Sequence, residues 1–322
     1  IGKALGAIFF IASGAAHAQA GAAAYPTKPV KLVVGFAAGG PTDVVARAFA
    51  DHASKALGQP FIIDNKPGAG TIIAAQAVAS APADGYTLLF GATNHTMIPA
   101  LYQGRVKFDA VKSFRPLCTV ASSPTVLVVA PSLPVKTLAD YQAKARAEPG
   151  RVTAGTAGVG SSGHFATEIF ARAQGLQLNH VPYKGAAPVV TDLMGGQLDS
   201  SFATLGSVLP QIQSGKLRAL AVGAPQRSAL VPDVPTFAEA GGGNYSADVW
   251  YGVLAPAGLP EPIALALERT AADFAKSASA IDRLRGLGLD TESVCGNAFA
   301  SRVAREVTTY SQMAKALDLK AD

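Results

Sequence analysis

The chain has 322 residues, of which 49% are hydrophobic and 15% are charged. This length and balance predict a globular protein with about two domains and an ample apolar core. The formal net charge is only +5, and no lysine- and arginine-rich segment stands out along the chain, so nucleic acid is not expected as a partner.

The first eighteen residues have the pattern of a secretory signal. Lys3 supplies a positive charge, Ala4 to Ala12 form a short apolar run, and the Ala-His-Ala triplet at 16–18 fits the rule for cleavage. The apolar run is too short to span a bilayer. We therefore predict a signal peptide at 1–18 that is removed on export, which leaves a soluble mature protein in the periplasm.

The two cysteines, Cys118 and Cys295, lie far apart in the sequence. Export to an oxidising compartment makes them candidates for a disulfide. Because sequence separation says nothing about their distance in space, two buried thiols are the favoured interpretation.

In the first part of the mature chain, short β-rich runs alternate with helical stretches. Residues 30–34, VKLVV, are apolar almost throughout, as in strands that a parallel sheet buries on both faces. The next stretch, 41–57, has apolar residues at helical spacing and ends before Gly58, a natural C-cap. Further strands are predicted at 61–64 and 86–91, with a helix between them. This β-α-β-α-β order predicts a parallel sheet covered by helices.

A second series of strands begins at 125–130, and another strand is predicted at 249–255 after a turn-rich segment. Since no long flexible linker separates the two α/β series, we expect two packed lobes joined by these two strands. Residues 25–124 and 250–322 would form lobe 1, and residues 125–249 would form lobe 2. Ligands in such sheets bind beyond the carboxyl ends of the strands, so the loops that follow the strands are the candidate site.

The loop GFAAGGPTD, residues 35–43, follows the first predicted strand and leads into the first helix. Its glycine spacing is that of a phosphate-binding loop, but Pro41 stands where that motif needs lysine, so a nucleotide is not favoured. The small residues Ala38 and Gly39 would let a ligand approach backbone amides at the helix N-terminus, with Thr42 as the N-cap. Such a loop suits a carboxylate; a plain strand-to-helix turn is the open alternative.

The loop TAGVGSSGH, residues 156–164, repeats this arrangement in the second series. Its glycines match G-x-G-x-x-G, but no acidic residue ends the next predicted strand, so a dinucleotide cofactor is not expected. Ser161 and Ser162 instead supply hydroxyl groups beside another helix N-terminus.

Other loops at strand ends are polar and uncharged. Thr93, Asn94 and Thr204 are candidates for orienting a small polar ligand, although such residues are often simple caps or turns. Tyr183 is a candidate aromatic wall. Lys184 is either a cation at the rim of the cleft or a solvated surface charge.

Catalytic motifs are not apparent. His95, His164 and His180 lie near strand ends but have no metal-binding spacing. Ser161 and Ser162 do not lie in a G-x-S-x-G nucleophile elbow. We therefore expect neither an enzyme nor a metal site.

Ordered motifs along the chain are similar to those of a known family. They include KLVVGFAAGGPTDVVAR, DNKPGAG, ADGYTLLFGATNH, PGRVTAGTAGVGSSGH, HVPYKGAAPVVTDLMGGQLD and WYGVLAPAGLP. The similarity covers about residues 25–320. On these motifs the chain resembles the extracytoplasmic solute-binding proteins of tripartite tricarboxylate transporters, also called the Bordetella uptake gene family.

This resemblance implies an α/β, two-lobed periplasmic-binding-protein fold of type II, a Venus flytrap with a ligand cleft between its lobes. It implies a small carboxylate ligand and membrane transporter subunits as partners, with no cofactor and no catalysis; a monomer suits hinge closure. The loops 36–43 and 156–164 would grip the carboxylate, partly through amides and ordered waters. The residues expected at the ligand are Phe36, Ala38, Gly39, Thr42, Asp43, Thr93, Asn94, Thr156, Gly160, Ser161, Ser162, His164, Tyr183 and Thr204.

Two departures from the family pattern bear on the ligand. At 71–72 the chain has Thr-Ile where the family usually has Gly-Asn, and at 203–204 it has Ala-Thr where the family often has Asp-Asn. Loss of the acid removes a partner for a ligand amine, so an amino acid is a less expected ligand. The sequence does not identify which carboxylate binds.

Two other functions were weighed against transport. A sensory module could bind the same ligand and present it to a membrane receptor kinase, and the sequence does not separate this role from transport. A hydrolase that uses Ser162 and His164 is disfavoured, because no catalytic motif surrounds them.

Overall fold

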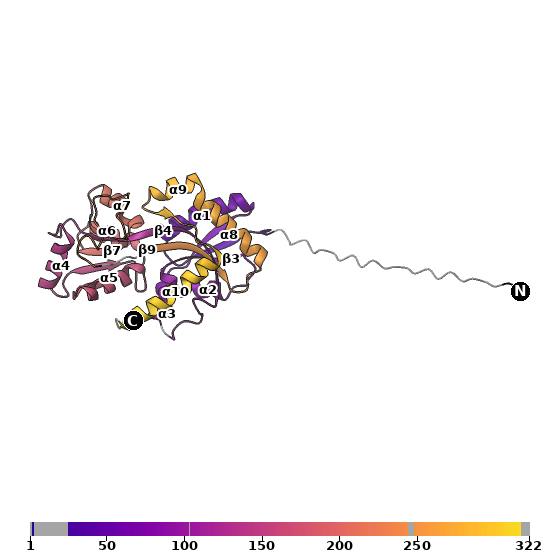
Figure 1. The fold of residues 1–322 in the computed structure, drawn as a ribbon, viewed down its shortest axis with the longest axis horizontal. Coiled ribbons are helices and arrows are strands. Elements are labelled where there is room, and N and C mark those ends of the chain that lie inside the picture. Colours follow the sequence, from indigo (N-terminus) through magenta and orange to yellow (C-terminus); the bar gives the residue numbers. More distant parts are fainter. Residues whose placement is uncertain (1, 3–24, 103, 244–247, 317–322) are drawn as a thin grey trace.

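The residues that the computed structural model describes are 2, 25–102, 104–243 and 248–316 (Figure 1). Apart from Gly2, the predicted signal peptide at 1–18 lies outside the described residues. Figure 1 shows two groups of helices and strands placed end to end, with β4 (Phe114–Val129) and β9 (Asp248–Pro256) running between them.

The first group is built on three parallel strands. β1 (Val30–Val34) lies between β2 (Phe61–Asn65) and β3 (Thr87–Ala92), and β9 pairs antiparallel with β3. All residues of β1 except Lys31 are buried, as its mostly apolar sequence predicts. The helices of this group are α1 (Pro41–Leu57), η1 (Ala69–Thr71), α2 (Ile72–Ala79), α3 (Asn94–Leu101), α8 (Glu261–Lys276), α9 (Ala278–Arg285) and α10 (Gly296–Ala316).

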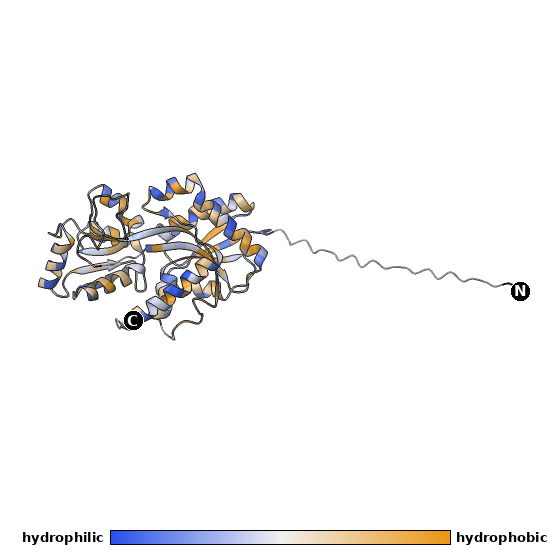
Figure 2. Cartoon of the chain, viewed as in Figure 1, coloured by the Kyte–Doolittle hydropathy of each residue, from blue (hydrophilic) through white to orange (hydrophobic). Residues whose placement is uncertain are grey.

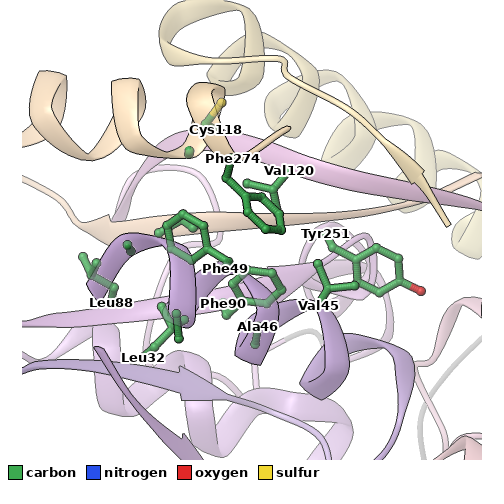
Figure 3. Packing of buried hydrophobic residues seen from close by; sticks show 14 of the residues in the cluster. Leu32, Val45, Ala46, Phe49, Leu88, Phe90, Cys118, Val120, Tyr251 and Phe274 are labelled. Carbon is green, nitrogen blue, oxygen red and sulfur yellow. The ribbon is translucent and has the colours of Figure 1, made fainter. Parts of the chain in front are cut away.

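A cluster of buried aromatic rings anchors α1 to this sheet (Figure 3). The centroid of the Phe49 ring lies 6.3 Å from that of Phe61 and 6.2 Å from that of Phe90. It also lies 5.8 Å from the ring of Phe274 on α8. Truncation of a buried phenylalanine to alanine costs about 3–5 kcal/mol of stability. The cluster therefore holds α1 firmly against β1 and so positions the loop between them.

β4 passes from one group to the other. Its first part pairs antiparallel with β9, and its second part, from Thr125 onward, pairs antiparallel with β7 (Ser200–Thr204) and β8 (Arg218–Gly223). The strand begins earlier than the expected segment 125–130, because its first part also completes the first sheet.

The second group repeats the parallel arrangement. β5 (Thr153–Thr156) lies between β6 (Asn179–Pro182) and β7, and all three strands run parallel. Their carboxyl ends therefore meet at one edge of the sheet, where the chain turns into helices. The helices of this group are α4 (Leu138–Ala147), α5 (Ser162–Ala173), α6 (Ala186–Met194) and α7 (Leu205–Gln213).

The whole sheet has the strand order β2-β1-β3-β9-β4-β7-β5-β6, and β8 and β10 (Asp290–Thr291) both pair with β4. The parallel α/β arrangement predicted from the alternating strands and helices is confirmed. Antiparallel β9 and β4 lie at the centre of this order, where they connect the two parallel parts.

Cys118 and Cys295 form a disulfide, so the expectation of two buried thiols is wrong. The bond joins β4 to the segment that precedes α10. Backbone pairing places these segments side by side: the Thr119 N–H donates to the Val294 carbonyl over 2.9 Å, and the Val294 N–H donates to the Thr119 hydroxyl over 2.9 Å. Sequence spacing could not show this contact, because it arises only when the C-terminal segment packs against the sheet.

Most helices carry hydrophobic and hydrophilic residues on different faces (Figure 2). In α8, for example, Ala264, Leu267, Ala271 and Phe274 are buried at helical spacing. Within the described residues, no helix combines the length and the apolar content needed to cross a bilayer.

Candidate ligand-binding site

Loops at the carboxyl ends of parallel strands from both groups line two adjoining pockets. The first, called the recess, extends along α6 and α7 and has a volume of about 160 Å³. The second, called the loop pocket, lies against the segment 67–71 and has a volume of about 550 Å³. The residues that line both are Phe36, Ala37, Asn94, Ala157, Ser161 and Lys184.

In the first group, the loop between β1 and α1 is shaped around Gly39. This glycine has φ +88°, a left-handed conformation that strains other residues, and its N–H donates to the Asp43 carboxylate over 3.0 Å. Arg47 donates to the same carboxylate through two nitrogens, over 2.9 and 3.0 Å. The Asn65 amide donates to Asp43 over 2.9 Å and to the Phe36 carbonyl over 3.0 Å. The buried Asp43 side chain thus holds the loop from behind.

Burial by itself would raise the pKa of the Asp43 carboxyl. Hydrogen bonds from Arg47, Gly39 and Asn65 outweigh burial and lower that pKa below its usual value, so the carboxylate is charged at neutral pH. Asp43 lines neither pocket. The Asp43 carboxylate holds the loop through these hydrogen bonds, and the Gly39 N–H is directed to Asp43.

α1 begins two positions earlier than it would if Thr42 were its N-cap. Pro41 occupies the first helical position, which suits proline because an N–H there would have no acceptor within the helix. Gly40 is therefore the N-cap, and the prediction of Thr42 as the cap is wrong. Thr42 lies in the first turn and lines the recess. Its backbone N–H is among those that lack an acceptor within the helix, so it is available to an anion.

In the second group, the loop between β5 and α5 is built in the same way around Gly160. This glycine has φ +80°, and its N–H donates to Nδ1 of His164 over 3.3 Å. Ser161 is the N-cap of α5, and its hydroxyl accepts from the His164 N–H over 3.3 Å. Ser162 opens the helix and lines the recess.

A pair of stacked histidines supports this second loop. The ring centroids of His164 and His180 lie 4.2 Å apart, and Nε2 of His180 lies 2.7 Å from the Thr156 hydroxyl. Burial, with a smaller contribution from His180, lowers the pKa of His164 to about 4, and burial also lowers the pKa of His180. Both rings are neutral at pH 7, so the lone pair on Nδ1 of His164 can accept the Gly160 N–H. Thr156 and His164 line neither pocket.

Thr93 and Asn94 follow β3 but have different roles. The Thr93 hydroxyl accepts from the Trp250 N–H over 2.8 Å, and the Thr93 N–H donates to the Trp250 carbonyl over 3.2 Å. Thr93 therefore ties the end of β3 to β9 and lines neither pocket. Asn94 lines both pockets, and its amide donates to the Thr71 hydroxyl over 2.6 Å.

Tyr183 and Thr204 line different pockets. The Tyr183 hydroxyl, in the loop pocket, donates to the Asp192 carboxylate over 2.6 Å, and this bond together with burial raises the pKa of Tyr183 to about 12. The Thr204 hydroxyl, in the recess, donates to the Ser207 hydroxyl over 3.2 Å. Tyr251 of β9 also lines the recess.

The structure brings most of the predicted residues to the two pockets. Those that line the recess are Phe36, Ala38, Thr42, Asn94, Ser161, Ser162 and Thr204. Gly160 and Tyr183 line the loop pocket. The predicted residues that line neither pocket, and instead belong to the framework around them, are Gly39, Asp43, Thr93, Thr156 and His164.

Sequence reasoning missed the apolar wall of the recess. Val189 and Leu193 of α6, Val208 of α7 and Val249 of β9 all line it. On their helices and strand these residues have the spacing of an ordinary core face, so nothing local marks them as pocket residues. The usable signal is the position of α6, which begins just after Lys184 at the carboxyl end of β6.

The polar groups of the site are almost all neutral. Of the described residues that line the two pockets, Lys184 is the only charged one, and its side chain is exposed. No group of three or more histidine, cysteine, aspartate or glutamate residues is placed to hold a metal ion in the part of the chain that the structure describes. The arrangement can bind a small anion through hydroxyl groups and the N–H groups of helix N-termini.

Solved structures of similar fold include periplasmic binding proteins. The R. palustris protein Rpa4515, solved with adipate, matches with a TM-score of 0.88 at 35% sequence identity, over 92% of this chain and 100% of that one. MatC from Rhodopseudomonas palustris, solved with bound malate, matches with a TM-score of 0.85 at 31% identity, over 89% and 99% of the two chains. The fold and the two opposed loops define the class of the protein: it is a two-lobed solute-binding protein.

Sequence comparison then shows the family. The profile of the tripartite tricarboxylate transporter family receptor matches residues 45–318. Protein BugT of Bordetella pertussis is 35% identical over 280 residues, which are 87% of this chain and 86% of BugT. The UPF0065 protein in the gbd 5' region of Cupriavidus necator is 40% identical over 241 residues, or 75% and 72% of the two chains. The chain therefore belongs to the tripartite tricarboxylate transporter receptor family, which confirms the resemblance; it is a binding protein and not an enzyme.

Proposed function

We propose that the protein captures a small carboxylate in the periplasm and delivers it to the membrane subunits of a tripartite tricarboxylate-type transporter. Membership of the receptor family supports the role in transport. The adipate and malate bound to two related structures support a carboxylate as the ligand of this chain. In this proposal the signal peptide at 1–18 is removed first, and the mature chain acts as a monomer.

One observation carries the proposal: helices from opposite groups begin at the same pocket. Thr42 in the first turn of α1 and Ser162 in the first turn of α5 both line the recess. The first N–H groups of a helix lack acceptors within the helix, and the helix dipole adds positive potential there. Each such terminus favours an anion by about 0.3–1 kcal/mol, so two of them and nearby hydroxyl groups can hold a carboxylate without an arginine.

Contacts between the two groups support a form that closes around the ligand. The Tyr102 hydroxyl at the end of α3 donates to the Val159 carbonyl over 3.5 Å. The Phe165 ring of α5 lies 5.4 Å from the Tyr310 ring of α10. Because these contacts join segments on either side of the pockets, they would separate if the groups moved apart to admit a ligand.

We assign residues 25–124 and 250–322 to lobe 1 and residues 125–249 to lobe 2. The pairing of β4 supports this division, since the strand exchanges β9 for β7 and β8 as partners at Thr125. A pair of strands that connects two lobes allows them to rotate about a hinge while each sheet stays intact.

Isothermal titration calorimetry with the mature chain tests the ligand class. We expect one binding site per chain for at least one member of a panel of small carboxylates, and loss of binding when that acid is replaced by its methyl ester. The ester keeps the body of the ligand and removes its charge. Equal binding of acid and ester would contradict the proposed carboxylate site.

A deletion strain tests the transport role. Uptake of the bound acid by cells should fall when the gene is removed and return when it is restored. Unchanged uptake, with loss of a transcriptional response to the acid, would instead indicate a sensory role.

A further inference from the structure

We infer that the ligand is a monocarboxylate with an apolar body about the size of one six-membered ring, and that this body fills the recess along α6 and α7. The inference rests on the proposed function, because it takes the carboxylate to lie at the N-termini of α1 and α5. The inference goes beyond the proposed function by stating which kind of acid the site selects.

The inner wall of the recess is apolar and buried. Val189 and Leu193 come from α6, Val208 comes from α7, and Val249 comes from β9. The exposed fractions of these four side chains lie between 0 and 4%. A ligand group placed against them leaves water for a hydrocarbon surface, which favours an apolar group and strongly disfavours a charged one.

Polar side chains beside this wall already have partners within the protein. The Ser201 hydroxyl donates to the Gly155 carbonyl over 2.7 Å. The Ser207 hydroxyl donates to the Thr204 carbonyl over 2.7 Å and receives a hydrogen bond from the Thr204 hydroxyl over 3.2 Å. Lys184, the only charged residue among the described lining, is exposed to solvent. A second carboxylate against the wall would therefore be buried without a cation to balance it.

The volume of the recess sets the size of the apolar body. It is about 160 Å³. An apolar cavity of about 150 Å³ is known to bind benzene. A six-membered ring therefore fits in this space, with its carboxylate at the helix N-termini that line the same pocket.

Calorimetry with the dialysed wild-type mature chain tests this inference with two matched pairs of acids, benzoate with terephthalate and hexanoate with adipate. In each pair the second acid carries a second, terminal carboxylate: terephthalate has it added to the benzoate ring, and adipate has it in place of the terminal methyl group of hexanoate. We expect each monoacid to bind about tenfold or more tightly than its diacid, with benzoate the tightest of the four. Equal or tighter binding of either diacid would overturn the inference and leave the proposed function intact. If none of these four acids binds but another member of the carboxylate panel does, the inference is overturned and the proposed function stands; failure of the whole panel would overturn both.

A variant that occupies the recess gives a second, independent test. Ala203 of β7 is partly buried and lines the recess, so Ala203→Leu puts a larger side chain into the space assigned to the ring. Affinity for benzoate should fall about tenfold or more, whereas Ala219→Leu, which enlarges a partly buried alanine of β8 that lines neither pocket, should stay within about threefold of wild type. Thermal melting shows whether each variant is folded. Unchanged affinity in a folded Ala203→Leu protein would overturn the inference; if that variant does not fold, the four acids and the wild-type chain still decide it.

Discussion

The two loops that approach the ligand, 35–43 and 156–164, have the same geometry but different chemistry. Each has a glycine of positive φ just before the N-cap, and the N–H of that glycine donates to the side chain at the third position of the following helix. In the first loop the acceptor is Asp43, and in the second it is His164. The recurring element is therefore the backbone shape, while the side chain that holds it can be charged or neutral.

The difference between the two acceptors has consequences for stability. Asp43 is an anion shared with Arg47 and Asn65, so several charge-assisted hydrogen bonds depend on it. His164 is a neutral ring that stacks on His180. The stability of the first loop should therefore depend more on charge. On acidification, the stability of the second loop should begin to fall at a higher pH.

The largest effect on ligand binding is expected from Gly39→Val, which disrupts the backbone conformation of the first loop. No atom lies within 4 Å of the added Cβ, so the penalty comes from placing a branched residue at φ +88°. Strain of about 1–3 kcal/mol is enough to change the loop and to weaken binding of the identified carboxylate about tenfold to a hundredfold in calorimetry. Gly150→Val is the matched control, since Gly150 has φ +72° and open space but lines neither pocket. Normal binding by Gly39→Val would show that the loop is only a turn.

A smaller effect, on stability, is expected when asparagine replaces each of the two acceptors, the charged Asp43 and the neutral His164. Asp43→Asn should lower the free energy of unfolding by about 2 kcal/mol, because hydrogen bonds to a charged acceptor contribute more than neutral ones, although exposure of Arg47 limits the ion pair. His164→Asn should lower it by about 1 kcal/mol, because an amide oxygen can still accept the Gly160 N–H. Urea unfolding measures both. A larger loss of unfolding free energy for His164→Asn would mean that stacking of the histidine ring stabilises the protein more than the charge of Asp43 does.

Acid should weaken the second loop before the first. The pKa of His164 is lowered from 6.5 to about 4, so between these values the unfolded chain binds more protons than the folded chain, and stability falls as the pH decreases. Burial also lowers the pKa of His95 to about 4, so His95 contributes to the same loss of stability in acid. His164→Asn should remove a slope of up to about 1.4 kcal/mol per pH unit within this window.

Asp43 also loses its contribution in acid, but at lower pH than His164. Its folded pKa is lowered, so its contribution is fully present above the unfolded value of about 3.9 and is lost only as the pH falls through the folded value. Urea unfolding at several pH values between 7 and 4.5 should therefore show the wild-type slope in Asp43→Asn and a shallower one in His164→Asn. A wild-type slope in both variants would exclude His164 as a contributor.

The smallest effects on stability are expected from substitutions at the N-termini of α1 and α5. Ser161→Ala removes the hydroxyl that caps α5 and should cost about 1 kcal/mol in urea unfolding. Thr42→Ala should cost less than about 0.5 kcal/mol, because Gly40 is the N-cap of α1 and the Thr42 side chain makes no capping bond. Equal losses in the two variants would mean that Thr42 stabilises the first turn in another way.

The order of strands and helices, and the positions of the loops between them, can be predicted from the amino-acid sequence. Apolar runs, helical spacing and the glycines of 35–43 and 156–164 are local signals, and local sequence strongly constrains local backbone conformation. The motifs were also long enough to indicate the family. For the same reason, most residues predicted at the ligand do line a pocket, since the carboxyl ends of parallel strands meet at one edge.

The roles of individual side chains at these loops depend on how the chain packs in three dimensions. Asp43 and His164 look equally suited to a ligand in the sequence, but packing turns both toward the backbone of their own loops. The apolar wall along α6 and α7 and the disulfide between Cys118 and Cys295 join segments that are distant in the chain. Such contacts depend on how sheets and helices pack in three dimensions, and the spacing of residues along a chain carries no direct record of that packing.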